Sequence, residues 1–86
     1  MKSSSDTLTV LLFASAKEKV GQDAIQLDLK LPASAAQLKK TLSLQYPELK
    51  PLMAISRLAV NRAFVEDSFI LQGSEELAII PPVSGG

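Results

Sequence analysis

Only one stretch of this 86-residue chain has the spacing of a long amphipathic helix. In this stretch, apolar side chains recur at intervals of three and four residues, at Ala35, Leu38, Leu42 and Tyr46. Ser34 and Gln37 have the capping-box spacing, in which each side chain binds the backbone N–H of the other, so we expect the helix to begin here. Pro47 stops it. The other apolar segments must therefore pack against this one helix.

Those other segments have the patterns of β-strands. Residues 24–31 alternate strictly between apolar and polar side chains, which predicts a half-exposed strand at or near a sheet edge. Residues 7–14 and 77–80 are apolar on both sides, which is typical of central strands covered on both faces. Two short strands are predicted on either side of Asn61 and Arg62, with a hairpin turn between them because Asn tolerates the left-handed conformation. Residues 67–73 are predicted to form a loop that buries Phe69 or Ile70.

The element order is therefore strand, strand, helix, two short strands and a final strand. A mixed sheet with one main helix packed across one face buries these apolar stripes in few residues. We expect the first and last strands to lie side by side in the middle of the sheet. This arrangement predicts an α+β protein with the ubiquitin-like β-grasp fold. We expect a flexible N-terminus at residues 1–6, the domain at residues 7–81 and an extended tail at residues 82–86.

The composition excludes several classes of function. The chain has no Cys and no His, which excludes Cys nucleophiles, Ser-His pairs and zinc sites, so no metal site is expected. Nine basic and nine acidic residues cancel and are dispersed, so no nucleic-acid partner is expected. The apolar runs are far shorter than the roughly 20 residues that cross a bilayer, and the N-terminus lacks the apolar middle of a secretion signal. We therefore expect a cytoplasmic protein without a membrane partner.

Four acidic residues fall near the C-terminal end of the sequence, at Glu66, Asp67, Glu75 and Glu76. They are consistent with a solvated acidic face and also with a docking surface for a basic partner. The pattern of the sequence leaves both interpretations open.

The last six residues, "PPVSGG", carry the strongest functional signal. Pro81 and Pro82 lack N–H donors, so they end the last strand and direct the chain away from the sheet. We expect Val83 to Gly86 to extend freely over about 13 Å. Gly85 and Gly86 have no side chains, so the tail can enter a narrow tunnel and present the α-carboxylate of Gly86 for reaction. When joined to AMP, a carboxylate becomes an acyl adenylate, from which a sulfur nucleophile can displace AMP and leave a thiocarboxylate.

Nearly the whole chain, residues 7–86, resembles the small subunits of molybdopterin synthase. The resemblance is carried by "VLLFASAKEKVG", which is similar to the family's first strand and short helix, and by the closing "GSEELAIIPPVSGG". It implies a sulfur carrier in molybdenum cofactor biosynthesis that is not an enzyme on its own. An adenylyltransferase that resembles ubiquitin-activating enzymes would adenylate Gly86 with ATP and magnesium, so that AMP is linked to Gly86 only transiently. A sulfurtransferase would then form the thiocarboxylate, and no permanently bound cofactor is expected.

The resemblance also implies a partner, the large subunit of molybdopterin synthase, in a heterotetramer with a central dimer of large subunits. There the tail would give its sulfur to cyclic pyranopterin monophosphate. From the residues alone, we expect the contact surface to be the apolar area around the tail, although each apolar residue of it could instead belong to the core. The predicted partner-binding residues are Phe13, Ile80, Pro81, Pro82, Val83, Ser84 and Gly85.

Two other functions fit a β-grasp domain that ends in Gly-Gly. A thiamine-pathway sulfur carrier shares the adenylation chemistry and donates to thiazole synthase, but it is usually shorter and does not usually end in Pro-Pro-Val-Ser before its glycines. A ubiquitin-related modifier would instead form isopeptide bonds with lysines. A β-grasp domain used only for interaction would need no free terminus.

Overall fold

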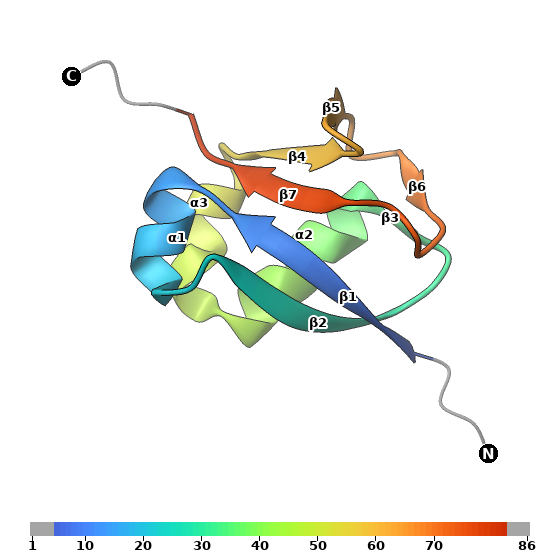
Figure 1. Ribbon diagram of the computed structural model, residues 1–86, viewed down its shortest axis with the longest axis horizontal. Helices are drawn as coiled ribbons and strands as arrows, with labels where there is room; N and C mark the ends of the chain where they lie inside the picture. Colours follow the sequence, from blue (N-terminus) through green and yellow to red (C-terminus); the bar gives the residue numbers. More distant parts are fainter. Residues whose placement is uncertain (1–4, 83–86) are drawn as a thin grey trace.

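A five-stranded mixed sheet forms the body of the protein in the computed structural model, which describes residues 5–82 (Figure 1). The strand order is β2-β1-β7-β4-β5. Strand β1 pairs parallel with β7, and the other neighbours are antiparallel. The first and last strands thus lie side by side, as predicted. The strands of this sheet are β1 (Ser5–Leu12), β2 (Ala24–Lys30), β4 (Arg57–Val60), β5 (Ala63–Val65) and β7 (Leu77–Ile80).

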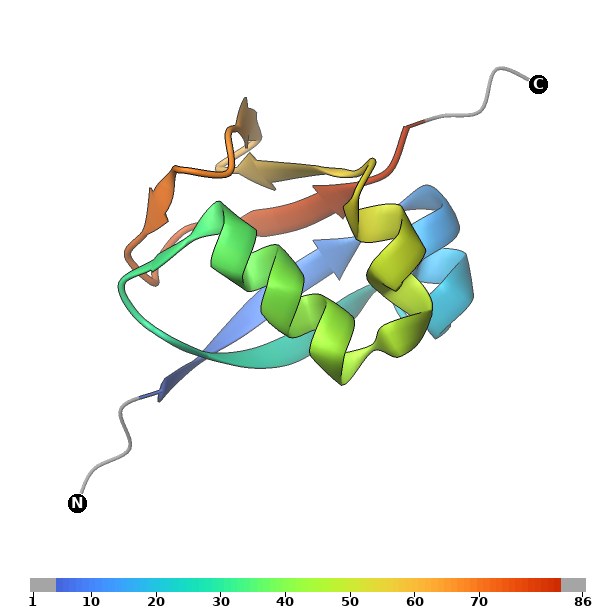
Figure 2. The same cartoon turned by 180° about the vertical axis from the view of Figure 1, so that it is seen from behind.

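The main helix, α2 (Ala35–Gln45), crosses one face of this sheet (Figure 2). It is followed by a 3-10 turn at Pro47–Leu49 and by the short helix α3 (Lys50–Met53), while α1 (Ala14–Val20) connects β1 to β2. A small two-stranded sheet, β3 (Ala33–Ser34) with β6 (Ile70–Leu71), lies at the start of α2. The prediction of an α+β fold with one main helix across a mixed sheet is confirmed.

The hydrophobic core lies between α2 and the sheet face that it covers. Strand β1 contributes Leu8, Val10 and Leu12, and its neighbours contribute further aliphatic side chains. Below the end of α2, Leu49 and Met53 complete the core. The largest fully buried side chains are Leu12, Leu27, Leu38, Leu42, Leu49, Leu58, Leu71, Leu77, Ile79 and Val10.

The predicted capping box at the start of α2 is formed. The backbone N–H of Gln37 donates to Ser34 Oγ at 3.1 Å, and the backbone N–H of Ser34 donates to Gln37 Oε1 at 2.8 Å. We expect Ser34→Ala to lower the free energy of unfolding by about 1 kcal/mol in chemical denaturation, because one N–H group loses its partner. Ser43→Ala in the same helix is the matched control. Its hydroxyl only donates back to the Lys39 carbonyl, so its loss should be neutral or slightly stabilising.

The bounds of β1 and the packing of residues 67–73 differ from the sequence-based expectation, and β1 ends at Leu12 rather than at Ala14. Strand β1 begins at Ser5, two residues earlier than predicted, because Ser5 and Asp6 pair with Lys30 and Leu29 of β2. In the predicted loop 67–73, Phe69 and Ile70 are exposed and Leu71 is the buried residue. The prediction that Phe69 or Ile70 is buried is therefore wrong. The antiparallel pairing of β6 with β3 explains the difference, because alternate strand residues point to opposite sides.

Candidate functional site

The chain leaves the sheet at the end of β7, as the two prolines predict. Strand β7 ends at Ile80, Pro81 is buried against the domain, and Pro82 is exposed. The other predicted site residues, Val83, Ser84, Gly85 and Gly86, lie outside the described residues. The structure therefore fixes the point from which the C-terminal segment starts.

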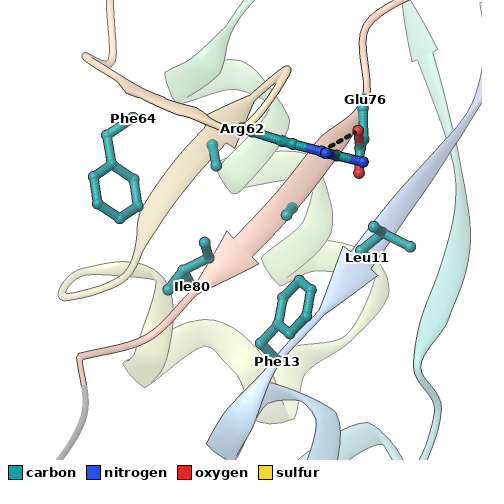
Figure 3. Close-up of a pocket in the computed structure, with 8 residues that line it drawn as sticks. Leu11, Phe13, Arg62, Phe64, Glu76 and Ile80 are labelled. Atoms are coloured by element: carbon teal, nitrogen blue, oxygen red, sulfur yellow. Dashed lines mark hydrogen bonds and ion pairs between the residues drawn. The ribbon is translucent and has the colours of Figure 1, made fainter.

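The sheet face opposite α2 carries an apolar groove of about 290 Å³ (Figure 3). None of the described helices lies over this face (Figures 1 and 2). Side chains that are distant in the sequence meet there because β1, β7, β4 and β5 are neighbours in the sheet. The apolar lining residues of this groove, here called the sheet-face groove, are Leu11, Phe13, Ala59, Phe64, Ala78 and Ile80.

The position of this groove corrects the prediction that both faces of β1 are covered, whereas in β7 Leu77, Ala78 and Ile79 are buried and only Ile80 is half-buried. In β1, Leu8, Val10 and Leu12 point into the core, whereas Leu11 is only half-buried and Phe13, just after the strand, is 47% exposed. The reason is that the described helices supply one covering layer, and α2 lies on one face only. The second apolar face is therefore left partly exposed in the described chain.

A second apolar hollow, of about 260 Å³, continues the groove toward the point where the chain leaves the sheet. It is lined by Ile55, Arg57, Phe64, Ile80, Pro81 and Pro82. Phe64 and Ile80 line both hollows, so the two form one surface. The guanidinium carbon of Arg57 lies 4.2 Å from the centre of the Phe64 ring, a cation–π contact that holds the ring at this junction.

The structure thus brings four of the predicted partner-binding residues onto one surface. Phe13 and Ile80 line the sheet-face groove, and Ile80, Pro81 and Pro82 line its continuation. Phe64, which is 50% exposed and joins the two hollows, was not among the predicted residues. The sequence did contain a signal for an open apolar face. Several strands are apolar on both sides, but the one predicted main helix can cover only one face of the sheet.

Two charged residues, Arg62 and Glu76, stand at one end of the sheet-face groove (Figure 3). Arg62 Nε lies 3.4 Å from Glu76 Oε1. Arg62 belongs to the turn between β4 and β5, and Glu76 directly precedes β7. The remaining lining is apolar, so this surface offers contact area and one polar end rather than groups for acid–base chemistry.

The loop before β7 is held by Glu75. Its carboxylate accepts hydrogen bonds from the backbone N–H groups of Gln72 and Gly73, both at 2.8 Å. Partial burial is the largest single influence and raises the pKa of Glu75, but the backbone N–H groups of residues 72–75 together lower it more, so the net pKa lies below the usual value. The ionised carboxylate therefore stabilises the loop that positions Glu76, and this contribution is lost as the pH falls through the lowered pKa.

Comparison with known proteins identifies the family. Residues 10–86 match the model of the ThiS family. The chain belongs to the ThiS family. It is 39% identical to a protein of Dictyostelium discoideum, over 95% of this chain and 99% of the relative. It is 42% identical to one of Arabidopsis thaliana, over 96% of this chain and 86% of the relative. Both are named molybdopterin synthase sulfur carrier subunit, which confirms the resemblance seen in the sequence.

Solved structures of similar shape confirm the β-grasp fold of this ThiS-family chain. The crystal structure of SAMP1 from Haloferax volcanii has a TM-score of 0.80 and 22% identity, covering 94% of this chain and 100% of that one. A chain in the complex of subunits 1 and 2 of molybdopterin-converting factor from Helicobacter pylori has a TM-score of 0.62 and 16% identity, with coverages of 94% and 100%.

Within residues 5–82, no helix is long and apolar enough to cross a membrane.

Proposed function

We propose that this chain carries sulfur in molybdenum cofactor biosynthesis, with the α-carboxylate of Gly86 as the reacting group. The observation that carries the proposal is the pair of relatives named molybdopterin synthase sulfur carrier subunit, which match nearly the whole chain at 39% and 42% identity. The closing "PPVSGG" and the prolines that end β7 support the same role. The chain acts as the sulfur-donating subunit of a sulfurtransferase and is not an enzyme on its own.

The proposed chemistry begins with activation of the carboxylate. A carboxylate oxygen of Gly86 attacks the α-phosphorus of ATP, and magnesium pyrophosphate leaves. A sulfur nucleophile, at the oxidation level of sulfide, then attacks the acyl carbon of the adenylate. The C–O bond to AMP breaks, AMP leaves with the electron pair, and the thiocarboxylate remains. An adenylyltransferase similar to ubiquitin-activating enzymes and a sulfurtransferase perform these steps, and this chain supplies the terminus.

Sulfur delivery takes place in the large subunit of molybdopterin synthase. The thiocarboxylate sulfur displaces an oxygen substituent from a carbon of cyclic pyranopterin monophosphate, so that a C–S bond forms as a C–O bond breaks and the oxygen leaves with the electron pair. Water then attacks the acyl carbon and cleaves the acyl–sulfur bond, which leaves the sulfur on the pterin as a thiolate. The carboxylate of Gly86 is thereby restored for another cycle. No residue of this chain other than Gly86 takes part in forming or breaking bonds.

The apolar surface beside the exit of the tail is the proposed docking site for the large subunit. The solved complex of subunits 1 and 2 of molybdopterin-converting factor supports a partnership of this kind. The exposed large apolar side chains of this surface are Phe13, Ile55 and Phe64, and large aromatic side chains dominate the energy of many interfaces. The groove continues to Pro81 and Pro82, where the tail begins. A partner that binds in the groove therefore lies next to the start of the tail and can receive it. The assembly is a heterotetramer with a central dimer of large subunits.

Mass spectrometry of the protein purified from its native cells tests the proposal. We expect a population in which one sulfur replaces one oxygen at Gly86, because the thiocarboxylate is the stored form. The same protein from cells that lack the activating enzyme is the control and should show only the carboxylate. Isopeptide conjugates on cellular lysines would favour a protein modifier, and delivery to thiazole synthase would favour a thiamine-pathway carrier. If either of these results is found and no sulfur from the thiocarboxylate reaches molybdopterin synthase, the proposal is contradicted.

A further inference from the structure

Arg62 occupies a backbone conformation that residues with a side chain rarely adopt. Asn61 and Arg62 have φ angles of 52° and 70°, and they form the two-residue turn between Val60 and Ala63, which pair across the hairpin. A turn of this kind needs positive φ at both central positions, and Gly is the favoured residue at the second. Arginine at this position is disfavoured for the turn itself, so its side chain becomes a candidate for a binding role.

The turn that carries Arg62 is tied to the sheet by Asn61. The backbone N–H of Asn61 donates to the Glu76 carbonyl at 2.8 Å, and the backbone N–H of Glu76 donates to Asn61 Oδ1 at 2.9 Å. These two bonds fix the backbone of Arg62 at the end of the sheet-face groove, next to the residue that precedes β7. The position of the guanidinium is therefore limited mainly by its own side-chain torsions.

The guanidinium of Arg62 keeps most of its hydrogen-bonding capacity for a ligand. Its side chain is 85% exposed, and its contact with Glu76 runs through Nε at a long 3.4 Å. A guanidinium has five N–H donors in a planar fork, so the two terminal NH₂ groups can bind a carboxylate while Nε keeps its contact. Figure 3 shows the side chain extending from the hairpin toward Glu76, across the end of the apolar floor.

The charge of the surface indicates which ligand fits it. The sheet-face groove and its continuation hold two guanidinium groups, of Arg57 and Arg62, and one carboxylate, of Glu76. Arg57 is stacked on Phe64, and Glu76 is already in contact with Arg62. The neighbouring carboxylate of Glu75 is engaged by backbone N–H groups. A partner that approaches this face therefore meets a positive group beside an apolar floor, and an anionic side chain complements it.

We propose that Arg62 is a specificity-determining residue of the docking surface. Its guanidinium binds an Asp or Glu carboxylate of the partner, while the partner's apolar side chains fill the sheet-face groove. The inference rests on the proposed function, in which that partner is the large subunit of molybdopterin synthase. An ion pair at the edge of an apolar contact is partly shielded from water, and it selects against partners that present a positive group there.

Binding measurements with the purified large subunit from the same organism test this role. Arg62→Gln and Arg62→Gly are expected to weaken binding roughly fivefold to tenfold at low salt. Their affinities should also depend less on salt than that of the natural chain, because the screened ion pair is gone. Glu76→Gln is expected to tighten binding, because it removes a negative charge close to the partner's carboxylate. Lys40→Gln, at an exposed position on α2, is the control for net charge and should bind like the natural chain.

Arg62→Gly separates binding from folding. Because Gly suits the second position of this turn, the variant should unfold at a higher temperature than the natural chain and still bind more weakly. If Phe13→Ala weakens binding while both Arg62 variants bind normally, Arg62 has no specificity role and the docking site stands. If the Arg62 variants bind more tightly and Glu76→Gln more weakly, the partner presents a cation and the inference is wrong. If the natural chain does not bind the large subunit at all, the proposed function itself is contradicted.

Discussion

A chain that lacks Gly86 is expected to deliver no sulfur and to unfold at the same temperature as the full-length chain. The deletion moves the terminal carboxylate back by one residue, about 3.3 to 3.6 Å along an extended chain. A displacement of about 1 Å in a reacting group can cost a hundredfold in rate, so this shift should remove adenylation and sulfur transfer from the measurable range. The measurement is molybdopterin formation in a reconstituted reaction with the activating enzyme, a sulfur donor and the large subunit.

The stability of the same variant separates loss of the reacting group from loss of the fold. The buried core of the described chain runs from Leu8 to Ile79, before the deleted residue. We therefore expect the free energy of unfolding to change by less than about 0.5 kcal/mol. Binding to the large subunit should persist, because the sheet-face groove is untouched. A clear drop in melting temperature, or sulfur delivery at the normal rate, would be incompatible with Gly86 acting only through its terminal carboxylate.

The parts of the fold that local chemistry determines could be predicted from the sequence. The capping box at Ser34 and Gln37 depends on two residues three positions apart, and it forms with both expected hydrogen bonds. The alternation along β2 predicted an edge strand, and β2 is an edge of the sheet. The turn at Asn61 and Arg62 also forms as predicted, although Arg is unusual there. In each case, the pattern and its physical cause lie within a few residues.

The docking surface could be predicted only in part, because it depends on residues that the sheet brings together from distant segments. Phe13 and Ile80 flank the tail in the predicted strand order, so the sequence indicated them. Phe64 comes from an edge strand of three residues, and only the order β1-β7-β4-β5 places it beside Ile80. Strand β1 is apolar on both sides, and its sequence does not indicate which side receives the helix and which remains open. The sequence of the turn at Asn61 and Arg62 also does not indicate that Arg62 lies at the end of a groove, because the groove forms only when the strands come together.

The rigidity of the body matters for the proposed function because the groove and the start of the tail are parts of one sheet. Ile80 lines both hollows, and Pro81 follows it directly. A partner that covers the groove is thereby held at a fixed position relative to Pro82, where the described part of the C-terminal segment ends. Anything that loosens the packing of α2 against the sheet would disturb this geometry as well as the stability.

Leu42→Ala in α2 is expected to lower the stability of the domain severely. Leu42 is fully buried between the helix and the sheet, and the substitution leaves a cavity that the surrounding side chains only partly fill. Replacing a core leucine by alanine costs about 2 to 5 kcal/mol. A domain of this size has a total stability of roughly 5 kcal/mol or somewhat more, so the variant should be close to unfolding at physiological temperature. Urea denaturation followed by circular dichroism measures the loss.

Leu44→Ala, two positions further along the same helix, is the matched control. Leu44 is 73% exposed, so the same chemical change creates no cavity there, and alanine is a slightly better helix former than leucine. We expect its free energy of unfolding to lie within about 0.5 kcal/mol of the natural value. Equal losses at the two positions would mean that the cost arises within the helix itself rather than in the core. A large loss at Leu42 alone places the cost at the contact between α2 and the sheet, whose opposite face carries the docking groove.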